Sequence, residues 1–298
     1  MPTPTLNIAV LGAGAIGSTF AFQLARAGGH RMTAVARPGS PRLAQLRRDG
    51  GLVNTAGDLA VVEVADTLDE QTPFDLIIVT VLAHQVDAVL PALARSRAGA
   101  ILFMFNTFQP QRLAEAVGME RCAWGMPFVQ ASLDADGRLR ASIGAGGQKC
   151  LLGRLAWVDL FNAARLPAAL EPRMPDWLIS HVPLCVAFES IAVAAMARGG
   201  GASWGEAMVR ARGANEGFRL IRALGQPVYP ASKARLSHAP TWGLAAMLWA
   251  MSKIPSFRQL LATGEGECRA LIDTMLAAAP GARTPIDAAR IEAMRPPG

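Results

Sequence analysis

Residues 6–40 read LNIAVLGAGAIGSTFAFQLARAGGHRMTAVARPGS, and this stretch decides the fold. It begins with an apolar run at residues 6–11 that predicts a buried strand. A glycine turn leads into residues 16–27, whose apolar spacing predicts a helix ending at Gly28 and Gly29. A second apolar run follows at residues 31–36. A strand, a glycine turn, a helix and a second strand predict the first unit of a parallel, doubly wound sheet.

The turn carries the pattern GxGxxG as Gly12-Ala13-Gly14-Ala15-Ile16-Gly17. Gly12 suits the tight turn, Gly14 lets backbone N–H groups approach a pyrophosphate, and Gly17 lets the helix pack close to the strand. The pyrophosphate would lie at the positive end of the helix dipole, where Ala15 and Ile16 begin the helix. A glycine-rich turn without a ligand is the alternative. Because this turn lies between a strand and a helix, we expect it to bind a dinucleotide.

The residue that ends the second strand indicates which dinucleotide binds. A site for NAD needs an acidic residue there to bond the ribose 2′-hydroxyl, but this sequence has Ala36, followed by Arg37. Arg37 can make a charge-assisted contact with a 2′-phosphate, and Ser40 can donate a hydrogen bond to it. Arg37 as an ordinary solvated loop residue is the alternative. The pattern therefore favours NADP(H) as the cofactor.

The rest of the chain changes pattern near residue 158, from strands alternating with helices to long helices. The fold class that we expect is α/β, with an N-terminal Rossmann domain at residues 1–170 and an all-helical domain at residues 171–298. Prolines 167, 172 and 175 mark the boundary, because proline interrupts helices. The further predicted strands are 59–64, 76–81, 101–105, 122–131, 139–143 and 150–153. The further predicted helices are 42–49, 85–95, 158–165, 177–197, 204–223, 231–237, 244–253, 257–263, 267–279 and 286–293.

Composition narrows the choice of partners. The 298 residues are 51% hydrophobic and carry a net charge of +6, but the basic residues are scattered and aromatics are sparse. We therefore expect a small-molecule substrate and no nucleic acid. Polar residues, among them Ser180 and Glu189, interrupt the apolar stretch 178–197, which predicts a core helix and no membrane partner. The four cysteines lack metal-ligand spacing and no secretory signal is evident, so the expectation is a cytoplasmic protein without a metal. A homodimer through the C-terminal helices is compatible with this pattern.

Several segments of the sequence resemble the ketopantoate reductase (2-dehydropantoate 2-reductase) family. In the first domain they are residues 6–37, residues 75–93 (DLIIVTVLAHQVDAVLPAL) and residues 101–118 (ILFMFNTFQPQRLAEAVG). In the second domain they are DWLISHVPL at 176–184, IPSFRQLL at 254–261 and RIEAM at 290–294. The resemblance implies a Rossmann domain followed by a helical domain, with the substrate between them. It also implies that NADPH delivers a hydride to a 2-keto acid.

The sequence departs from the family where the resemblance implies catalytic groups. The lysine expected two residues after Trp177 is Ile179, and the asparagine expected four residues later is Pro183. The lysine expected after the strand of the first domain is Leu82. Since a hydride added to a ketone leaves an oxyanion that needs an adjacent donor, these changes predict another substrate than ketopantoate.

At other positions, the sequence retains two polar residues of the family and has a glutamate near, but not at, the expected place. Asn106, which the resemblance places near the nicotinamide, is retained, as is the substrate-binding Ser256. The expected glutamate falls on Cys268 or Leu271, depending on register, while Glu267 is close but not aligned.

Three polar residues lie near the emptied positions in the sequence. Lys253, three residues before Ser256, ranks first as the replacement acid, and a solvated lysine at a helix end is the alternative. His181 lies within one turn of Ile179 and ranks second, with a core histidine as the alternative. His84, near Leu82, is a candidate for substrate binding or a helix-end surface residue.

Glu189 lies eight residues after His181, so helical geometry places the two on nearly one face. It would be either a buried orienting carboxylate or a packing contact.

The function that we expect is an NADPH-dependent reductase of a carbonyl or an imine. A non-redox isomerase or cyclase, and an NADP-binding sensor with degenerate catalytic residues, are the alternatives.

Overall fold

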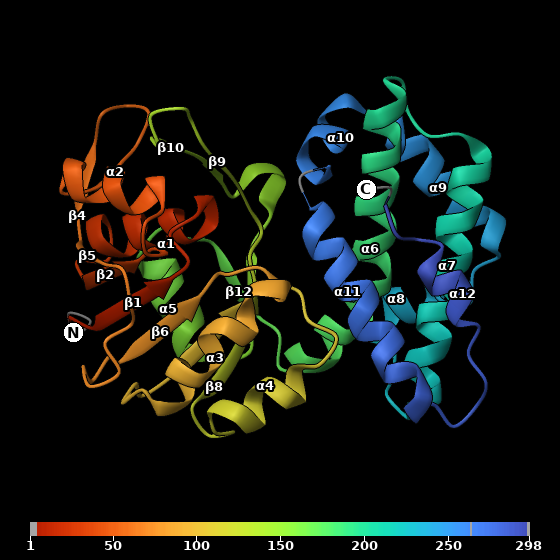
Figure 1. Cartoon of the computed structure of the whole chain (residues 1–298), viewed down its shortest axis with the longest axis horizontal. Helices are drawn as coiled ribbons and strands as arrows, with labels where there is room; N and C mark the ends of the chain where they lie inside the picture. Colours follow the sequence, from red (N-terminus) through yellow and green to blue (C-terminus); the bar gives the residue numbers. More distant parts are fainter. Residues whose placement is uncertain (1–4, 263, 297–298) are drawn as a thin grey trace. The chain divides into compact units, whose positions relative to one another are not determined.

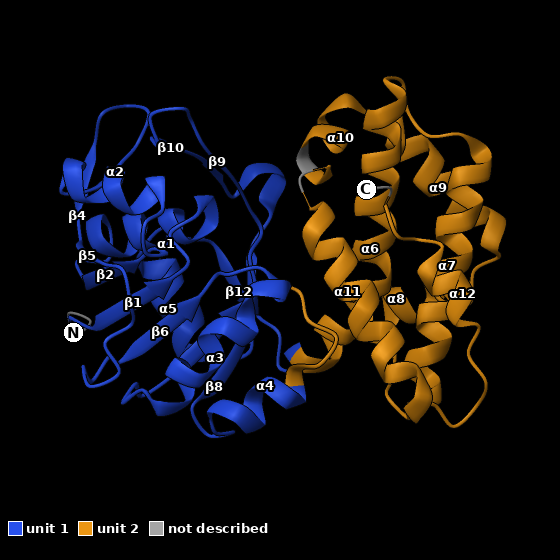
Figure 2. Ribbon diagram, viewed as in Figure 1, with its two compact units in different colours: residues 1–105, 111–174 blue, residues 106–110, 175–298 orange. Residues whose placement is uncertain are grey.

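In the computed structural model, which describes residues 5–262 and 264–296, the chain divides into two compact units. One comprises residues 1–105 and 111–174, and the other comprises residues 106–110 and 175–298 (Figure 2). The chain thus leaves the first unit after Met174, where the sequence placed the boundary after residue 170. The short segment from Asn106 to Pro110 belongs with the second unit, although it directly follows a strand region of the first.

The first unit contains an eight-stranded sheet in the order β12-β11-β8-β7-β6-β1-β2-β5 (Figure 1). Neighbouring strands are parallel except β8 and β11, which are antiparallel. The central strands are continuous apolar runs because helices cover both faces of a doubly wound sheet. The strand bounds are β1 Asn7–Leu11, β2 Arg31–Val35, β5 Glu63–Ala65, β6 Leu76–Val79, β7 Ile101–Met104, β8 Cys122–Met126, β11 Cys150–Leu152 and β12 Ala168–Leu170.

Strand β1 pairs with β2 on one side and β6 on the other, so the strand order reverses beside it. Ligands bind at the carboxyl ends of strands at such a switch point. Helix α1 packs on one face of the sheet through Phe20, whose ring lies 5.2 Å from that of Phe161 on α5. The helices of this unit are α1 Ala15–Arg26, α2 Pro41–Asp49, α3 Val86–Arg95, α4 Pro110–Val117, which begins at the last residue of the segment 106–110, and α5 Leu155–Ala163.

Two hairpins lie outside the main sheet and account for most differences from the predicted strands. The predicted strand 122–131 is two strands, because Pro127 separates β8 from β9 (Val129–Leu133), which pairs with β10 (Leu139–Ile143). The predicted strand 59–64 is also two, since β4 (Leu59–Val61) pairs with β3 (Gly51–Val53) while β5 joins the main sheet. Helix α4 and strands β3 and β12 were not predicted.

The second unit is helical and is built around α6 (Figure 1). Helix α6 is long and apolar enough to cross a membrane, but 78% of its most apolar 18-residue window is buried within the structure, as in a core helix. The sequence predicted that Pro175 interrupts a helix. Pro175 instead lies in the first turn of α6, where proline is tolerated. The predicted end at residue 263 lies outside the described residues. The helices are α6 Met174–Arg198, α7 Trp204–Ala223, α8 Ala231–Leu236, α9 Thr241–Ser252, α10 Pro255–Leu261, α11 Glu265–Ala278 and α12 Ala288–Glu292.

The α/β fold class, with a parallel sheet followed by a helical region, is therefore confirmed.

Candidate functional site

The glycine turn leaves β1 at Gly12, whose φ of +105° suits glycine and few other residues. Its N–H donates to the Val35 carbonyl at 3.1 Å, and Thr80 Oγ1 donates to the Gly12 carbonyl at 2.8 Å. A Cβ at Gly12 would lie 3.1 Å from the backbone of Thr80. The turn is thus tied to the ends of β2 and β6, and a side chain at Gly12 would be tightly packed and strained.

Gly14 and Gly17 differ in the space around them, which is open at Gly14 and fully occupied at Gly17. A Cβ at Gly17 would overlap the Gly12 carbonyl oxygen, so only glycine lets α1 pack this close to the turn. Gly14 is the N-cap of α1, and a Cβ there would have no heavy atom within 4 Å. No side chain caps the helix, and Ala15 and Ile16 are partly exposed. The open N-terminus of α1 therefore fits a pyrophosphate, which would satisfy its free N–H groups.

Arg42 of α2 braces this turn, although the sequence did not single it out. Its Nε donates to the Ala13 carbonyl at 2.9 Å, and one Nη donates to Ser18 Oγ at 2.7 Å. The other Nη donates to the Gly137 carbonyl at 2.6 Å and to Gln45. Burial lowers the pKa of Arg42 to about 10, so the guanidinium is charged at neutral pH. A fixed cation at the turn adds to the positive potential of the helix end.

The end of β2 has the composition expected for NADP. Ala36 is buried, Arg37 is exposed, and no hydrogen bond or ion pair engages the Arg37 guanidinium within the described residues. Ser40 is the N-cap of α2 and accepts a hydrogen bond from the Leu43 N–H at 3.2 Å, so it has a structural role that the sequence reading did not include.

A carboxylate that the sequence reading missed lies at the same edge. Asp66 follows Ala65, and Ala65 is paired with Val35 of β2. Arg47 lies 2.9 Å from Asp66 and, by hydrogen bonding to it, lowers the pKa of its carboxyl group. The Asp66 charge is therefore paired with Arg47.

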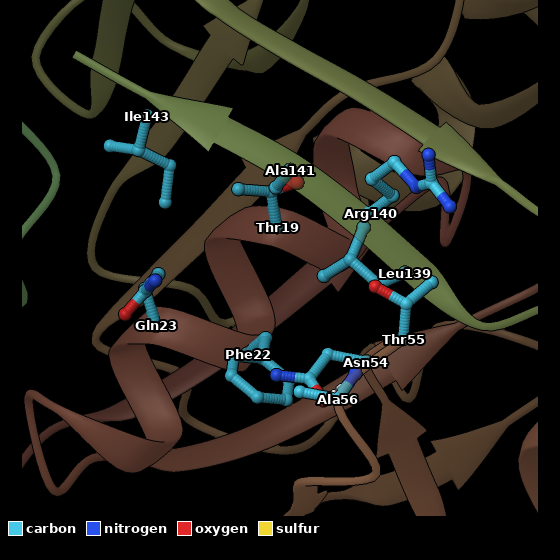
Figure 3. Close-up of a pocket in the computed structure, with 10 residues that line it drawn as sticks. All are labelled: Thr19, Phe22, Gln23, Asn54, Thr55, Ala56, Leu139, Arg140, Ala141 and Ile143. Carbon is cyan, nitrogen blue, oxygen red and sulfur yellow. Dashed lines mark hydrogen bonds between the residues drawn. The ribbon is translucent and has the colours of Figure 1, made fainter. Parts of the chain in front are cut away.

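A hollow of about 160 Å³ lies elsewhere on the first unit, between α1 and the β9–β10 hairpin (Figure 3). None of the predicted site residues lines it, so it is separate from the glycine turn. Its lining residues are Thr19, Phe22, Gln23, Asn54, Thr55, Ala56, Leu139, Arg140, Ala141 and Ile143.

A second polar site begins at Asn106, two residues after β7 ends. Asn106 is 6% exposed, and its Nδ2 donates to Glu267 Oε1 of α11 at 3.3 Å. Its Oδ1 is buried without a hydrogen-bond partner. Glu267 lies in the first turn of α11, where the helix dipole favours a carboxylate. The retained asparagine thus orients a glutamate that the sequence comparison had placed one residue out of register.

Glu189 of α6 adds a second carboxyl group to this site. Glu189 is 7% exposed, accepts a hydrogen bond from Cys185 Sγ at 3.3 Å, and leaves Oε2 buried without a partner. A Cβ at Gly264 would lie 2.8 Å from Glu189 Cδ, so a glycine backbone packs where any side chain would collide with the carboxyl group. We call Asn106, Glu189 and Glu267 the carboxyl cluster.

The two carboxyl groups of the cluster cannot both ionise easily. Burial and the nearby charge of Glu267 raise the pKa of Glu189 to about 8. Burial also raises the pKa of Glu267, but hydrogen bonds from the side chain and backbone of Asn106 oppose that rise. Because the pKa of Glu189 is about 8, we assign a proton to Glu189 at neutral pH.

His181 lies two turns before Glu189 on α6 but makes different contacts. Its ring stacks on Trp177 with centroids 4.6 Å apart. The Lys233 ammonium lies 3.5 Å from the centre of the Trp177 ring and donates to the Trp177 carbonyl at 3.0 Å. Burial, together with the charge of Lys233, lowers the pKa of His181 to about 3. The imidazole is therefore neutral at physiological pH and a poor proton donor.

The other predicted residues are exposed. Lys253 is the C-cap of α9, and its ammonium lies 5.0 Å from the centre of the Trp249 ring. Ser256 lies in the first turn of α10, and His84 lies in a short 3-10 helix at Ala83–Gln85. The described residues show no hydrogen bond that joins Lys253 or Ser256 to Asn106, whose amide pairs with Glu267. Their roles remain predictions.

The chain is similar to known proteins both in sequence and in structure. Residues 8–156 match the family model described as "Ketopantoate reductase PanE/ApbA". No curated protein matches the sequence. A PanE/ApbA family ketopantoate reductase from Ralstonia eutropha JMP134 has a similar structure, with a TM-score of 0.71 and 18% identity over 97% of this chain and 95% of that one.

Two further solved structures are similar. A 2-dehydropantoate 2-reductase from Geobacter metallireducens GS-15 has a TM-score of 0.68 and 19% identity, covering 97% of this chain and 98% of that one. D-mandelate dehydrogenase, solved with NADH and anilino(oxo)acetate, has a TM-score of 0.68 and 17% identity, covering 97% and 95%. At these identities the likeness concerns the fold.

Proposed function

Because the chain belongs to the ketopantoate reductase family, whose members are oxidoreductases acting on keto and hydroxy groups, we propose that it is an NADPH-dependent reductase. Its substrate carries a C=O or C=N bond and is not ketopantoate. The observation that carries the proposal is the carboxyl cluster, in which Asn106, two residues after β7, donates a hydrogen bond to Glu267. Bound NADPH supplies the hydride, and the residues of the chain orient the substrate and handle the proton.

Glu189 is the proton donor in this proposal. A carbonyl or imine that accepts a hydride gains charge on its oxygen or nitrogen, and a nearby acid lowers that barrier. A carboxyl group with a pKa of about 8 holds its proton at neutral pH, which an ordinary glutamate does not. Asn106 and Glu267 orient the reacting group. Lys253 remains a second candidate, while the lowered pKa of His181 argues against a role as acid.

The preference for NADP(H) is supported by the end of β2. Ala36 offers no carboxylate to a ribose 2′-hydroxyl, and the exposed Arg37 guanidinium is available to a 2′-phosphate. We expect NADPH to bind more tightly than NADH by about 1–3 kcal/mol. Calorimetric titration with each nucleotide tests this preference, and equal affinities would contradict it.

A labelling experiment tests the reaction class. The protein is incubated with NADPH deuterated at C4 of the nicotinamide and with a panel of 2-oxo acids, ketones and cyclic imines, and the products are analysed by mass spectrometry. We expect deuterium in at least one product, with ketopantoate turned over about 100-fold more slowly than the best substrate because the lysine positions hold Ile179 and Leu82. NADPH binding with no transfer to any compound would favour a non-redox enzyme.

A further inference from the structure

We propose that the carboxyl cluster binds a protonated nitrogen of the substrate, so that the enzyme reduces iminium ions or carbonyl compounds that carry an ammonium group. This inference rests on the proposed function, because it names the substrate class of the same site. It comes from the hydrogen-bonding balance and the charge of Asn106, Glu189 and Glu267.

The cluster has acceptors that lack donors. Glu189 Oε2 and Asn106 Oδ1 are both buried without a partner. Within the described residues, the donors that hydrogen-bond to Glu267 or Glu189 are the Asn106 amide, the Asn106 backbone N–H and the Cys185 thiol. An unsatisfied buried acceptor costs about 1–3 kcal/mol. An ammonium group has three donors, and an iminium has one or two, so either would satisfy acceptors that the chain leaves open.

The charge of the cluster also favours a cation. The nearby charge of Glu267 acts on the buried carboxyl group of Glu189. The neighbouring arginines are engaged elsewhere. Arg210 of α7 is hydrogen-bonded to Ser190, and Arg295 is paired with Asp273 and Glu292; both act on the nearby Cys268 thiol. No cationic side chain among the described residues pairs with Glu189 or Glu267. A substrate carboxylate placed here would add a negative charge beside that of Glu267, whereas a substrate cation would neutralise the cluster.

The reaction balances for an iminium substrate. The hydride from NADPH forms a new C–H bond at the C=N carbon, and the π electrons move to nitrogen, which becomes a neutral amine. The amine then takes the proton of the Glu189 carboxyl group and leaves as an ammonium ion, with Glu189 left as a carboxylate. NADPH is oxidised to NADP⁺, the carbon is reduced, and solvent restores the proton to Glu189.

Binding is tested without any turnover. Propylammonium chloride and 1-propanol have the same heavy-atom skeleton and differ in charge, so they are titrated into protein labelled with ¹³C at the glutamate carboxyl groups. We expect propylammonium to shift the Glu189 and Glu267 signals at millimolar concentrations, with at least about tenfold weaker binding of 1-propanol, since an ion pair in a buried site is worth about 1.4 kcal/mol or more. Sodium chloride at equal concentration controls for ionic strength.

Variants locate the site. Glu189→Gln and Glu267→Gln should each weaken propylammonium binding about tenfold or more. The matched control is Glu265→Gln, which removes a partly exposed carboxylate from the same first turn of α11, where it pairs with Arg269. Glu265→Gln should bind propylammonium like the wild type. If Glu189→Gln and Glu267→Gln also bind like the wild type, or if 1-propanol binds as well as propylammonium, the proposal is overturned and the carboxyl pair is structural.

A turnover comparison separates this inference from the proposed function. 1-Pyrroline and cyclopentanone have the same ring size, and only the former becomes an iminium. We expect NADPH-dependent reduction of 1-pyrroline to exceed that of cyclopentanone by about tenfold or more in kcat/KM. Reduction of neutral ketones with no preference for nitrogen would overturn this inference and keep the proposed function. Binding of propylammonium with no reduction of any compound would sustain the cation site and contradict the reductase.

Discussion

The glycine turn of the first unit and the carboxyl cluster of the second unit were predictable to very different degrees. The turn is local: Gly12, Gly14 and Gly17 lie within six consecutive residues, and their spacing alone indicates their geometry. The cluster is assembled from Asn106 and Glu267, which lie 161 residues apart, and from Glu189 on another helix. A local motif such as the glycine turn can be recognised from residue spacing, whereas a cluster built from distant residues is visible only in the folded chain.

The largest expected effect comes from removing the proton of the cluster. Glu189→Gln keeps the shape and one acceptor but has no carboxylic acid, so we expect kcat to fall by about 10²–10⁴. NADPH affinity, measured by calorimetry, should stay within about twofold because the glycine turn is unchanged. Glu265→Gln is the control. Full activity in Glu189→Gln would remove the cluster from the chemistry and leave Lys253 as the candidate acid.

Glu189→Gln should also change how the free energy of unfolding depends on pH. The folded pKa of Glu189 is about 8, raised from an ordinary 4.5, so the protonated carboxyl group favours the folded state. That contribution is complete below pH 4.5 and is lost as pH rises through 8. We expect the free energy of unfolding of the wild type to fall by roughly 2–5 kcal/mol across this window, and by much less in Glu189→Gln. Urea denaturation at several pH values measures it, and parallel profiles would disprove the assignment.

At the glycine turn, two alanine variants should behave differently. Gly17→Ala places a Cβ against the Gly12 carbonyl and should lower the stability of the fold by about 1–3 kcal/mol. Gly14→Ala has open space around its Cβ, so the fold should keep its stability while the methyl group obstructs the pyrophosphate and weakens nucleotide binding. Thermal unfolding and nucleotide titration distinguish the two. Equal losses of stability would mean that the turn has no open phosphate face.

Arg37→Ala tests the end of β2. Removal of the guanidinium should weaken NADPH binding by about 1–3 kcal/mol and leave NADH nearly unchanged. Arg48→Ala, an arginine of α2 paired with Asp49, is the matched control and should change neither nucleotide. Loss of NADH affinity to the same extent would show that Arg37 contacts a part of the cofactor common to both.

The smallest expected effect is at Ser40. Because its Oγ caps α2, Ser40→Ala should lower the free energy of unfolding by about 1 kcal/mol. NADPH affinity should fall by less than in Arg37→Ala, since a neutral donor is weaker than a guanidinium. Chemical denaturation measures the first effect and calorimetry the second. Unchanged stability would mean that the cap contributes nothing.

Most strands and helices could be predicted from the sequence because local residue patterns determine them. Buried parallel strands are apolar runs such as LIIV in β6, and the long helices keep their periodicity. The division at Pro127 was missed because the apolar pattern does not show that β8 pairs with β7 while β9 pairs with β10. The family register placed the expected glutamate on Cys268 or Leu271, and only the hydrogen bond in the folded chain relates Glu267 to Asn106. The low pKa of His181 comes first from burial and then from the charge of Lys233, 52 residues further along the chain, and no spacing rule reveals either.

The titration of the two cluster carboxyl groups tests the central claim most directly. Selective ¹³C labelling of glutamate, with Glu189→Gln and Glu267→Gln to assign the signals, gives each pKa in the folded protein without any substrate. We predict that Glu189 titrates near pH 8 and that its pKa falls in Glu267→Gln, where the neighbouring charge is gone. Two carboxyl groups that both titrate below pH 5 would contradict the claim, since neither would hold a proton for the reaction at neutral pH.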